Sequence, residues 1–253
     1  MLIAFDIGNT HTVIGIFDGD KLVHNFRLES ERDRTVDEFA LQISGLLKLK
    51  DINFSSVSKA IICCVVPALT RVFSKLCVKY FNVTPLIVND NLKLDIEIKV
   101  DDPSTVGADR LVNVYACREI YGYPVVVVDL GTATTFDVLD NSGAYCGGAI
   151  SPGMMISAQA LFDRAAMLPN IELFSPSKSV GKNTKDAMLS GIVLGYVGLV
   201  DSMVKRLFAE LNITGKVIAT GGIARLVSQQ SATITDLVPD LTLDGLRIIA
   251  SKY

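Results

Sequence analysis

The strongest constraint on this sequence is a pattern that occurs twice. Residues 2–23, LIAFDIGNTHTVIGIFDGDKLV, contain an apolar segment that ends in an acid, a glycine turn, a second apolar segment and an Asp-Gly turn. Residues 125–150, VVVVDLGTATTFDVLDNSGAYCGGAI, repeat this order with an Asn-Ser-Gly turn in place of the Asp-Gly turn. Helical periodicity follows both copies. The duplicated β-β-β-α-β-α unit predicts an α/β fold of two similar lobes facing a central cleft, to which each lobe presents the glycine turn after its strand-end acid.

Alternation and periodicity place the individual elements. We expect helices at 36–49, about 153–166, about 184–210 and 223–229, with a capping box at Thr35 and Glu38 for the first. A further helix carries Leu69, Val72, Phe73, Leu76 and Tyr80, and the tail 241–253 forms a last short helix. Strands are expected at 59–66, 84–88 and 216–220 in addition to those of the two repeats. The predicted domains are 1–115 and 116–253, with no flexible linker.

Composition excludes several classes of protein. The chain has 253 residues, 49% apolar, and a net charge of −3 without a Lys/Arg stripe, so we expect no nucleic-acid partner. The five cysteines contain no C-x-x-C pair, which favours a reduced cytosol without disulfides or a metal centre. The longest uncharged segment, 187–200, is shorter than the roughly 18–20 residues of a membrane span. The sequence therefore predicts a soluble, cytoplasmic protein.

Asp6 and Asp129 end the first strand of each repeat. Two carboxylates that face each other in a low dielectric repel by several kcal/mol, and a divalent cation with nucleotide phosphates would remove that cost. The neighbouring Gly8 and Gly131 would let phosphate oxygens approach the backbone. Hydroxyl and amide groups nearby could bind those oxygens: Asn9, Thr10, Thr132, Thr134 and Thr135. Either motif alone is also typical of a plain solvated turn, but the duplication in register favours a binding site.

Two further segments have both a structural and a functional interpretation. TGG at 220–222 ends a strand and opens a helix, which suits either a plain β-α turn or a nucleotide contact. GADR at 107–110 begins a helix, where Asp109 either complements the helix dipole or orients a substrate hydroxyl as a base. A carboxylate at that position is a weak base, so its contribution would be mainly positional.

Two glycine-containing segments need a separate interpretation. SVGKNT at 179–184 is similar to a phosphate-binding P-loop, but Pro176 and Asn183 stand where that motif requires Gly and Ser or Thr, so we reject it. Gly191, Gly195 and Gly198 lie inside the predicted helix 184–210. They indicate a close helix contact, either within the lobe or across a dimer.

Three motifs together resemble a known family. DIGNT at 6–10, GADR at 107–110 and DLGT at 129–132 are similar in order and spacing to the signature motifs of type III pantothenate kinases. GGAISPG, KNT, TGG and LTLDGL, which begin at 147, 182, 220 and 241, also resemble that family, so the similarity covers nearly the whole chain. It implies two ribonuclease-H-like lobes of the actin/hexokinase/heat-shock chaperone superfamily. It also implies ATP-dependent phosphorylation of pantothenate to 4′-phosphopantothenate, the first step of coenzyme A biosynthesis, by a homodimer that needs Mg²⁺ and potassium or ammonium.

The resemblance also implies roles for individual residues. The ATP phosphates would be bound by Asp6, Ile7, Gly8, Asn9, Thr10, His11, Thr12 and Val13, and the nucleotide also by Thr132, Gly221 and Gly222. Pantothenate would be bound by Gly107, Ala108, Asp109, Arg110 and Thr184 of the partner subunit, with Asp109 as the catalytic proton acceptor. The residues alone suggest Mg²⁺ between the two strand-end acids. The resemblance instead gives Mg²⁺ to Asp6 and the monovalent cation to Asp129.

One position departs from the family, and two other functions compete. Members often have a tyrosine against the substrate where this chain has Val100, which puts one substrate contact in doubt. A phosphatase or a sugar kinase of the same fold is disfavoured by the short chain and by GADR. A non-catalytic regulatory protein is disfavoured by the acidic balance and by the presence of all three acids, Asp6, Asp109 and Asp129.

Overall fold

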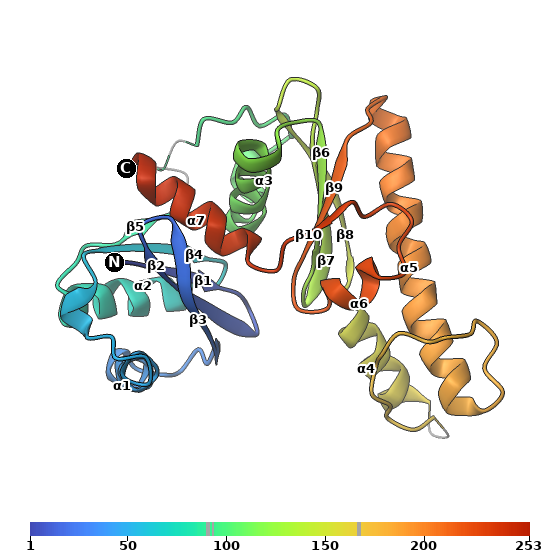
Figure 1. Ribbon diagram of the computed structural model, residues 1–253, viewed down its shortest axis with the longest axis horizontal. Helices are drawn as coiled ribbons and strands as arrows, with labels where there is room; N and C mark the ends of the chain where they lie inside the picture. Colours follow the sequence, from blue (N-terminus) through green and yellow to red (C-terminus); the bar gives the residue numbers. More distant parts are fainter. Residues whose placement is uncertain (90–91, 93, 166–167) are drawn as a thin grey trace. The chain divides into compact units, whose positions relative to one another are not determined.

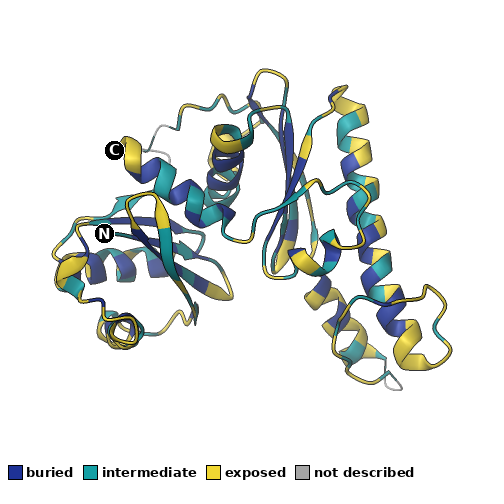
Figure 2. Cartoon of the chain, viewed as in Figure 1, coloured by how far each residue is buried: buried dark blue, intermediate teal, exposed yellow. Residues whose placement is uncertain are grey.

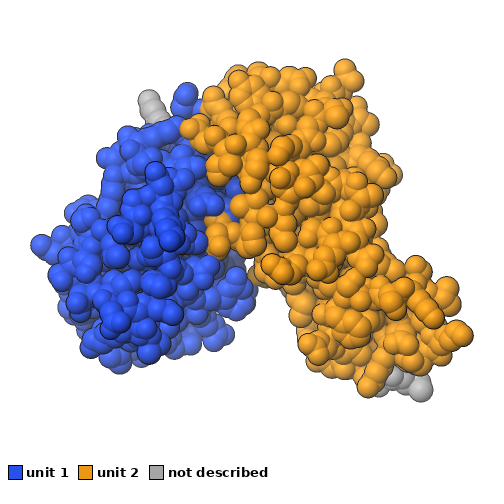
Figure 3. Space-filling view, viewed as in Figure 1, with its two compact units in different colours: residues 1–95, 104–116, 241–253 blue, residues 96–103, 117–240 orange. Residues whose placement is uncertain are grey.

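The computed structural model describes residues 1–89, 92, 94–165 and 168–253, and its chain divides into two compact units. Unit 1 consists of Met1–Asp95, Ser104–Ala116 and Leu241–Tyr253, and unit 2 of Ile96–Pro103 and Cys117–Asp240 (Figure 3). Each unit contains one five-stranded sheet, sheet A in unit 1 and sheet B in unit 2.

Sheet A has the strand order β3-β2-β1-β4-β5, in which β1 to β3 form an antiparallel meander and β4 and β5 run parallel to β1. Its strands are β1 (Leu2–Ile7), β2 (His11–Asp18), β3 (Lys21–Glu29), β4 (Lys59–Cys64) and β5 (Leu86–Ile87). Several helices lie wholly or partly in unit 1. They are α1 (Val36–Lys48), α2 (Pro67–Leu76), a π-helical turn (Cys77–Phe81), α3 (Ala108–Tyr121) and α7 (Leu241–Lys252), with 3-10 turns at Phe54–Ser56 and Pro103–Thr105.

Apolar packing explains this arrangement. Ile3 and Phe5 of β1 point to one face of the sheet and are fully buried in a cluster with α1 and α2. On the other face α7 packs on β1, β2 and β4 (Figure 1). Because both faces are covered, β1 is apolar throughout until its end at Asp6 and Ile7. The predicted capping box of α1 is present: Thr35 accepts from the Glu38 amide, and the Glu38 carboxylate accepts from Thr35.

Sheet B has the order β10-β9-β6-β7-β8 and repeats the topology of sheet A. Its strands are β6 (Val125–Leu130), β7 (Ala133–Leu139), β8 (Tyr145–Pro152), β9 (Lys216–Thr220) and β10 (Asp236–Leu237). The remaining helices are α4 (Met154–Arg164), α5 (Thr184–Leu211) and α6 (Ala224–Ser228). One face of sheet B forms a core with α5 and α6 through residues such as Val126, Phe136 and Val193.

The predicted duplication is confirmed at the level of strand register. The two acids occupy equivalent places, each with one antiparallel and one parallel neighbour: Asp6 with Val13 and Cys63, and Asp129 with Thr135 and Thr220. The α/β class with two similar lobes is therefore correct. That the turn after Asp6 and the turn after Asp129 face one common cleft stays a prediction.

The contacts divide the chain differently from the expected bounds 1–115 and 116–253 in two segments. Residues 241–253 belong to unit 1, because α7 packs on sheet A, where Leu243 lies against Gly15 of β2. Residues 96–103 belong to unit 2, because Ile98 forms a bridge with Tyr145 of β8. The change from unit 1 to unit 2 falls inside α3, after Ala116.

The long helix α5 matches its predicted range within one residue. By length and composition alone it is apolar enough to cross a membrane, but the core helix of a soluble protein passes the same test. Buried and exposed residues alternate along it (Figure 2), as in a helix that packs on one side. The expected helix at 153–166 is α4, which ends at Arg164; residue 166 lies outside the described residues.

Gly191, Gly195 and Gly198 of α5 make no close contact in the part of the chain that the structure describes. Apart from the neighbouring backbone of α5 itself, a β-carbon at any of the three would meet no heavy atom of the described residues within 4 Å. The interpretation of these glycines as a close contact within the lobe is therefore wrong for the described residues, and the interpretation as a dimer contact stays a prediction.

Candidate active site

The first glycine turn follows Asp6 and Ile7 at the end of β1. The Gly8 amide donates to the His11 carbonyl at 3.0 Å, which closes a tight turn. Asn9, Thr10 and His11 are exposed on it, whereas Asp6 is half-buried at its base. This arrangement offers exposed amide and hydroxyl groups beside a carboxylate, as a phosphate-binding turn requires.

Thr12 and Val13 belong to β2 and differ from the turn in exposure. Thr12 is fully buried, and its hydroxyl lies 2.9 Å from the hydroxyl of Ser30. The side chain of Thr12 is therefore engaged inside unit 1, and any contact with a nucleotide must come from its main chain. Sequence reasoning missed Ser30, whose only signal was its place directly after β3.

Asp109 lies in the first turn of α3, as the GADR motif predicted. One of its carboxylate oxygens accepts from the Arg110 amide at 2.9 Å. A β-carbon at Gly107 would lie 2.5 Å from that same oxygen. Only glycine at 107 leaves room for this carboxylate position, which gives the motif a steric explanation.

Cys63 of β4 lies near the acids of the first and second motifs in unit 1. It is fully buried and is the register partner of Asp6 on β4. Burial raises the pKa of the Cys63 thiol well above its ordinary value, and the nearby charges of Asp6 and Asp109 raise it further. The acid of the turn and the acid of GADR therefore lie near one neutral thiol. Sequence reasoning missed Cys63, since a cysteine in an apolar strand has no distinguishing signal.

The second turn follows Asp129 at the end of β6 and is lined by glycines. A β-carbon at Gly221 would lie 2.6 Å from the Asp129 Oδ1 atom, and one at Gly131 would lie 3.4 Å from it. Gly221 also has φ of +97°, a conformation that side chains rarely adopt. DLGT and TGG, which are about 90 residues apart in the sequence, thus meet at one carboxylate, as two parallel neighbouring strands allow.

The hydroxyl groups after Asp129 do not all face the same way. Thr132 is exposed on the turn, which agrees with a nucleotide contact. Thr134 is fully buried and its hydroxyl contacts the Tyr196 hydroxyl, so the expectation that it binds phosphate is wrong. Thr135 donates to Asp137 at 2.9 Å. The reason is the period of two along β7, which sends neighbouring threonines to opposite faces.

Two residues predicted to contact pantothenate or to alter that contact lie in unit 2. Thr184 is the first residue of α5 and is exposed, next to Asn183, which caps the helix by accepting from the Asp186 amide at 2.9 Å. Val100 packs against Gly147, where a β-carbon would lie 3.4 Å from Val100 Cγ1. Gly222, which was expected to bind the nucleotide, also lies in unit 2 and is exposed beside Gly221.

The acids fit cations that keep much of their own water. Among the described residues, no three or more His, Cys, Asp or Glu side chains form a group that could hold a metal ion. Mg²⁺ on a nucleotide needs only one or two carboxylates besides the phosphates, which Asp6 can supply. Asp129 offers a hard oxygen donor of the same kind at the second turn.

Two copies of this sheet, each with an acid and a glycine turn at the end of its first strand, define an actin/hexokinase-like fold that many kinases share. Solved structures agree. A protein assigned as 2-dehydro-3-deoxygalactonokinase from Sinorhizobium meliloti matches with a TM-score of 0.64 at 13% identity, over 100% of this chain and 99% of the other. An inorganic polyphosphate/ATP-glucomannokinase from Arthrobacter sp. strain KM matches with 0.51 at 15% identity, over 100% and 99%.

Comparison of the sequence with known families and relatives assigns the chain to one family of kinases. The family model for type III pantothenate kinase matches residues 2–206. The type III pantothenate kinase of Geobacillus sp. (strain WCH70) is 46% identical over 252 residues, which cover 100% of this chain and 98% of the relative. The chain belongs to the type III pantothenate kinase family and is thus a kinase, a transferase. The resemblance seen in the three motifs is confirmed.

Proposed function

We propose that this chain phosphorylates pantothenate with ATP, giving 4′-phosphopantothenate in the first step of coenzyme A biosynthesis. Family membership over the full chain supports this function. The structural observation that supports it best is that the Asp6 turn and Asp109 belong to the same unit, where the charges of both acids help to raise the pKa of the buried Cys63 thiol. A phosphate-binding turn and an acid for the acceptor hydroxyl must lie close together in a kinase, and both belong to unit 1.

The nucleotide is bound by the two glycine turns. In unit 1 the main chain and side chains of Asp6 to Val13 bind the phosphates, with Thr12 contributing its backbone only. In unit 2 Thr132, Gly221 and Gly222 bind the same ATP. The exposure of Asn9, Thr10, Thr132 and Gly222 supports this assignment.

Pantothenate is bound by the beginning of α3. Asp109 accepts a hydrogen bond from the primary hydroxyl of pantothenate and takes its proton as the oxygen forms a bond to the γ-phosphorus atom. The bond between that phosphorus and the bridging oxygen of ATP breaks, and ADP leaves. Gly107, Ala108 and Arg110 bind the rest of the substrate together with Thr184 of the partner subunit. The position of Asp109 in the first turn of α3 suits a group that aligns the hydroxyl more than one that attracts its proton strongly.

Asp6 holds Mg²⁺ and Asp129 holds potassium or ammonium. When bound, these cations neutralise the charge that develops on the transferred phosphoryl group. The chain contributes one carboxylate to each cation.

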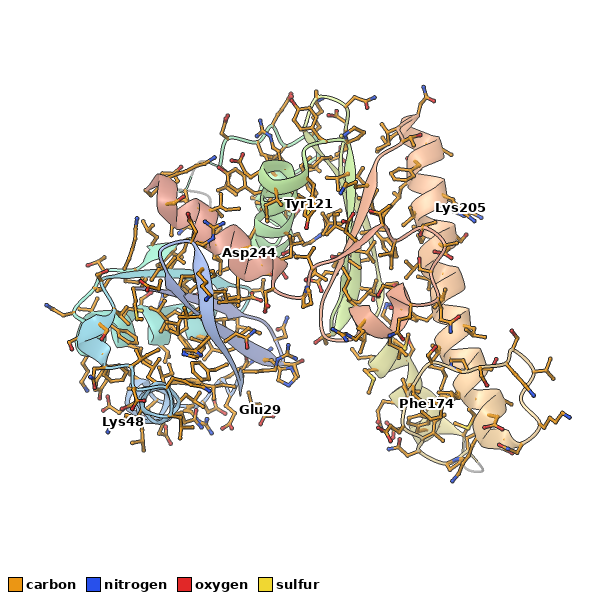
Figure 4. The ribbon with its side chains drawn as sticks, viewed as in Figure 1. Glu29, Lys48, Tyr121, Phe174, Lys205 and Asp244 are labelled. Atoms are coloured by element: carbon orange, nitrogen blue, oxygen red, sulfur yellow. The ribbon has the colours of Figure 1, made fainter. Side chains whose placement is uncertain are left out.

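The enzyme acts as a cytoplasmic homodimer without nucleic-acid or membrane partners. Unit 2 exposes large apolar side chains, among them Phe174 in the segment between α4 and α5 (Figure 4), as a subunit interface would require. The open positions beside Gly191, Gly195 and Gly198 on α5 agree with a second helix packing there. The five cysteines are free thiols, which suits a reducing compartment.

Phosphoryl transfer is tested by following 4′-phosphopantothenate directly by ³¹P NMR, so that no coupling enzyme adds its own potassium requirement. The reaction contains MgATP with potassium chloride, or with choline chloride at the same ionic strength. A pantothenate analogue without the primary hydroxyl is the matched control. We expect product only with pantothenate, and much faster formation in potassium.

Each alternative function predicts a different result in this assay. ADP release that is independent of pantothenate would indicate a phosphatase or ATPase, and phosphorylation of glucose added in place of pantothenate would indicate a sugar kinase. No phosphoryl transfer under any condition would indicate a non-catalytic protein. Equal rates in potassium and choline would contradict the cation proposed at Asp129 but not the transfer itself.

A further inference from the structure

Tyr196 is a buried tyrosine of α5 whose hydroxyl reaches sheet B. Its side chain is nearly enclosed in the core that α5 forms with the sheet. The hydroxyl contacts the Thr134 hydroxyl of β7 and lies 2.8 Å from the Pro152 carbonyl at the end of β8. One phenol thus connects a helix to two neighbouring strands beside the second glycine turn.

The direction of these hydrogen bonds follows from the number of protons. The Pro152 carbonyl can only accept, so the single proton of Tyr196 goes to it. The proton in the contact between the two hydroxyl groups must then come from Thr134. Thr134 donates to Tyr196, which donates to Pro152. Both hydroxyl groups are satisfied without water in this chain, as buried polar groups require.

The residue after Pro152 lies directly on the turn. The Gly153 amide donates to the Thr132 carbonyl at 3.1 Å. A β-carbon at Gly153 would lie 2.3 Å from that carbonyl oxygen and 2.5 Å from the Gly131 carbonyl oxygen. The backbone at Gly153 is therefore in close contact with both residues of the turn, and a shift of Pro152 moves the surface on which the turn rests.

We propose that Tyr196 is a positioning residue for nucleotide binding. By holding the Pro152 carbonyl it fixes Gly153 against the backbone of Gly131 and Thr132, and so keeps the turn in the conformation that binds ATP. This inference rests on the proposed role of Thr132 in nucleotide binding. It gives α5 a function toward the nucleotide that is separate from Thr184 at its first residue.

The direct test removes one oxygen atom with Tyr196→Phe. The ring remains in the core, and among the side chains of the described residues the Pro152 carbonyl keeps the Ser151 hydroxyl, 3.4 Å away. Because Thr134 would then be left with an unsatisfied buried hydroxyl, the double variant Tyr196→Phe/Thr134→Val removes both polar groups and separates that stability cost from the effect on the turn.

The matched control is Tyr145→Phe. Tyr145 is also a fully buried tyrosine of unit 2, and its hydroxyl donates to Asp137 at 2.8 Å, not to Pro152. Both substitutions remove one buried phenolic hydroxyl from the same unit. The melting temperature of each variant, the Kd for MgADP by calorimetry and the KM values for ATP and pantothenate are measured in parallel.

We expect Tyr196→Phe and the double variant to raise the Kd for MgADP and the KM for ATP by about fivefold or more, as the loss of one net hydrogen bond implies. The KM for pantothenate should change less than the KM for ATP. Tyr145→Phe should lower the melting temperature while leaving the Kd for MgADP near the wild-type value.

Two results would overturn the inference. In the first, Tyr196→Phe binds MgADP as tightly as the wild type. In the second, both tyrosine variants weaken MgADP equally, as a general loss of stability would do. If the wild type itself binds no MgADP, the proposed nucleotide site fails instead, so the two failures are distinguishable.

Discussion

Gly107 and Gly221 each lie beside one of the three proposed functional acids, and Gly221 is also required by its φ of +97° and by the backbone of Leu130, 2.6 Å from where its β-carbon would lie. A β-carbon at Gly107 would collide with Asp109, and one at Gly221 would collide with Asp129. The glycines therefore leave room for the carboxylate positions that the structure shows. At the scale of single residues, Gly107 and Asp109 of GADR are in close contact, and so are Gly221 of TGG and Asp129 of DLGT.

Asp109→Asn tests the catalytic assignment at this scale. The amide keeps the size of the side chain but cannot take a proton, so we expect turnover to fall by about 10²- to 10⁴-fold while the Kd for MgADP stays near its wild-type value. Glu119→Gln is the control, because Glu119 is an exposed carboxylate on the same helix. Wild-type turnover in Asp109→Asn would show that Asp109 is not the proton acceptor.

Among the elements, α5 is tied to its surroundings by polar contacts as well as by apolar packing. Asp201 accepts hydrogen bonds from the Ser231 hydroxyl at 2.5 Å, the Thr233 hydroxyl at 2.7 Å and the Ala232 amide at 3.0 Å. Burial by itself would raise the pKa of Asp201, but these hydrogen bonds outweigh it, so the pKa lies below the ordinary value of 3.8. The loop before β10 is thereby held to the helix.

The stability contributed by Asp201 should depend on pH. A carboxylate with a lowered pKa stabilises the folded state fully above its unfolded pKa near 3.8, and this contribution is lost as the pH falls through the lower folded value. We expect Asp201→Asn to cost about 1–3 kcal/mol at pH 7, seen as a lower melting temperature, and to differ less from the wild type at the most acidic pH. Glu210→Gln, an exposed carboxylate of α5, is the control. A difference from the wild type that is constant with pH would contradict this account.

The elements and their order were largely predictable from the sequence, because they follow from local patterns. The ends of β9 and the first residue of α5 were predicted correctly, as was the cap at Thr35. What failed depends on non-local geometry. The face of Thr134 depends on the length of the turn before it, since a shift of one residue reverses every side chain of a strand.

The sequence also did not show which sheet a helix packs against. The pattern of LTLDGL shows that α7 is amphipathic but not which sheet it covers, so its place in unit 1 was not foreseen. The same limit applies to Cys63 and Tyr196. Both are ordinary core residues in the sequence, and only the fold brings them beside Asp6, Asp109 and Pro152.

On the scale of the whole molecule, the account depends on the duplication. Each repeat supplies one acid and one glycine turn in the same strand register, and the segment between the repeats supplies Asp109. We propose that these parts act on one ATP and one pantothenate. Neither unit contains all three acids, since Asp6 and Asp109 belong to unit 1 and Asp129 to unit 2.

The most direct measurement is a crystal structure of the enzyme with potassium, Mg²⁺, a non-hydrolysable ATP analogue and pantothenate. The account predicts that Asp6 contacts the Mg²⁺ bound to the phosphates and that Asp109 accepts a hydrogen bond from the primary hydroxyl of pantothenate. It also predicts that Asp129 contacts a potassium ion beside the same nucleotide. A structure in which these carboxylates point into separate regions of solvent, with the ligands bound elsewhere, would contradict it.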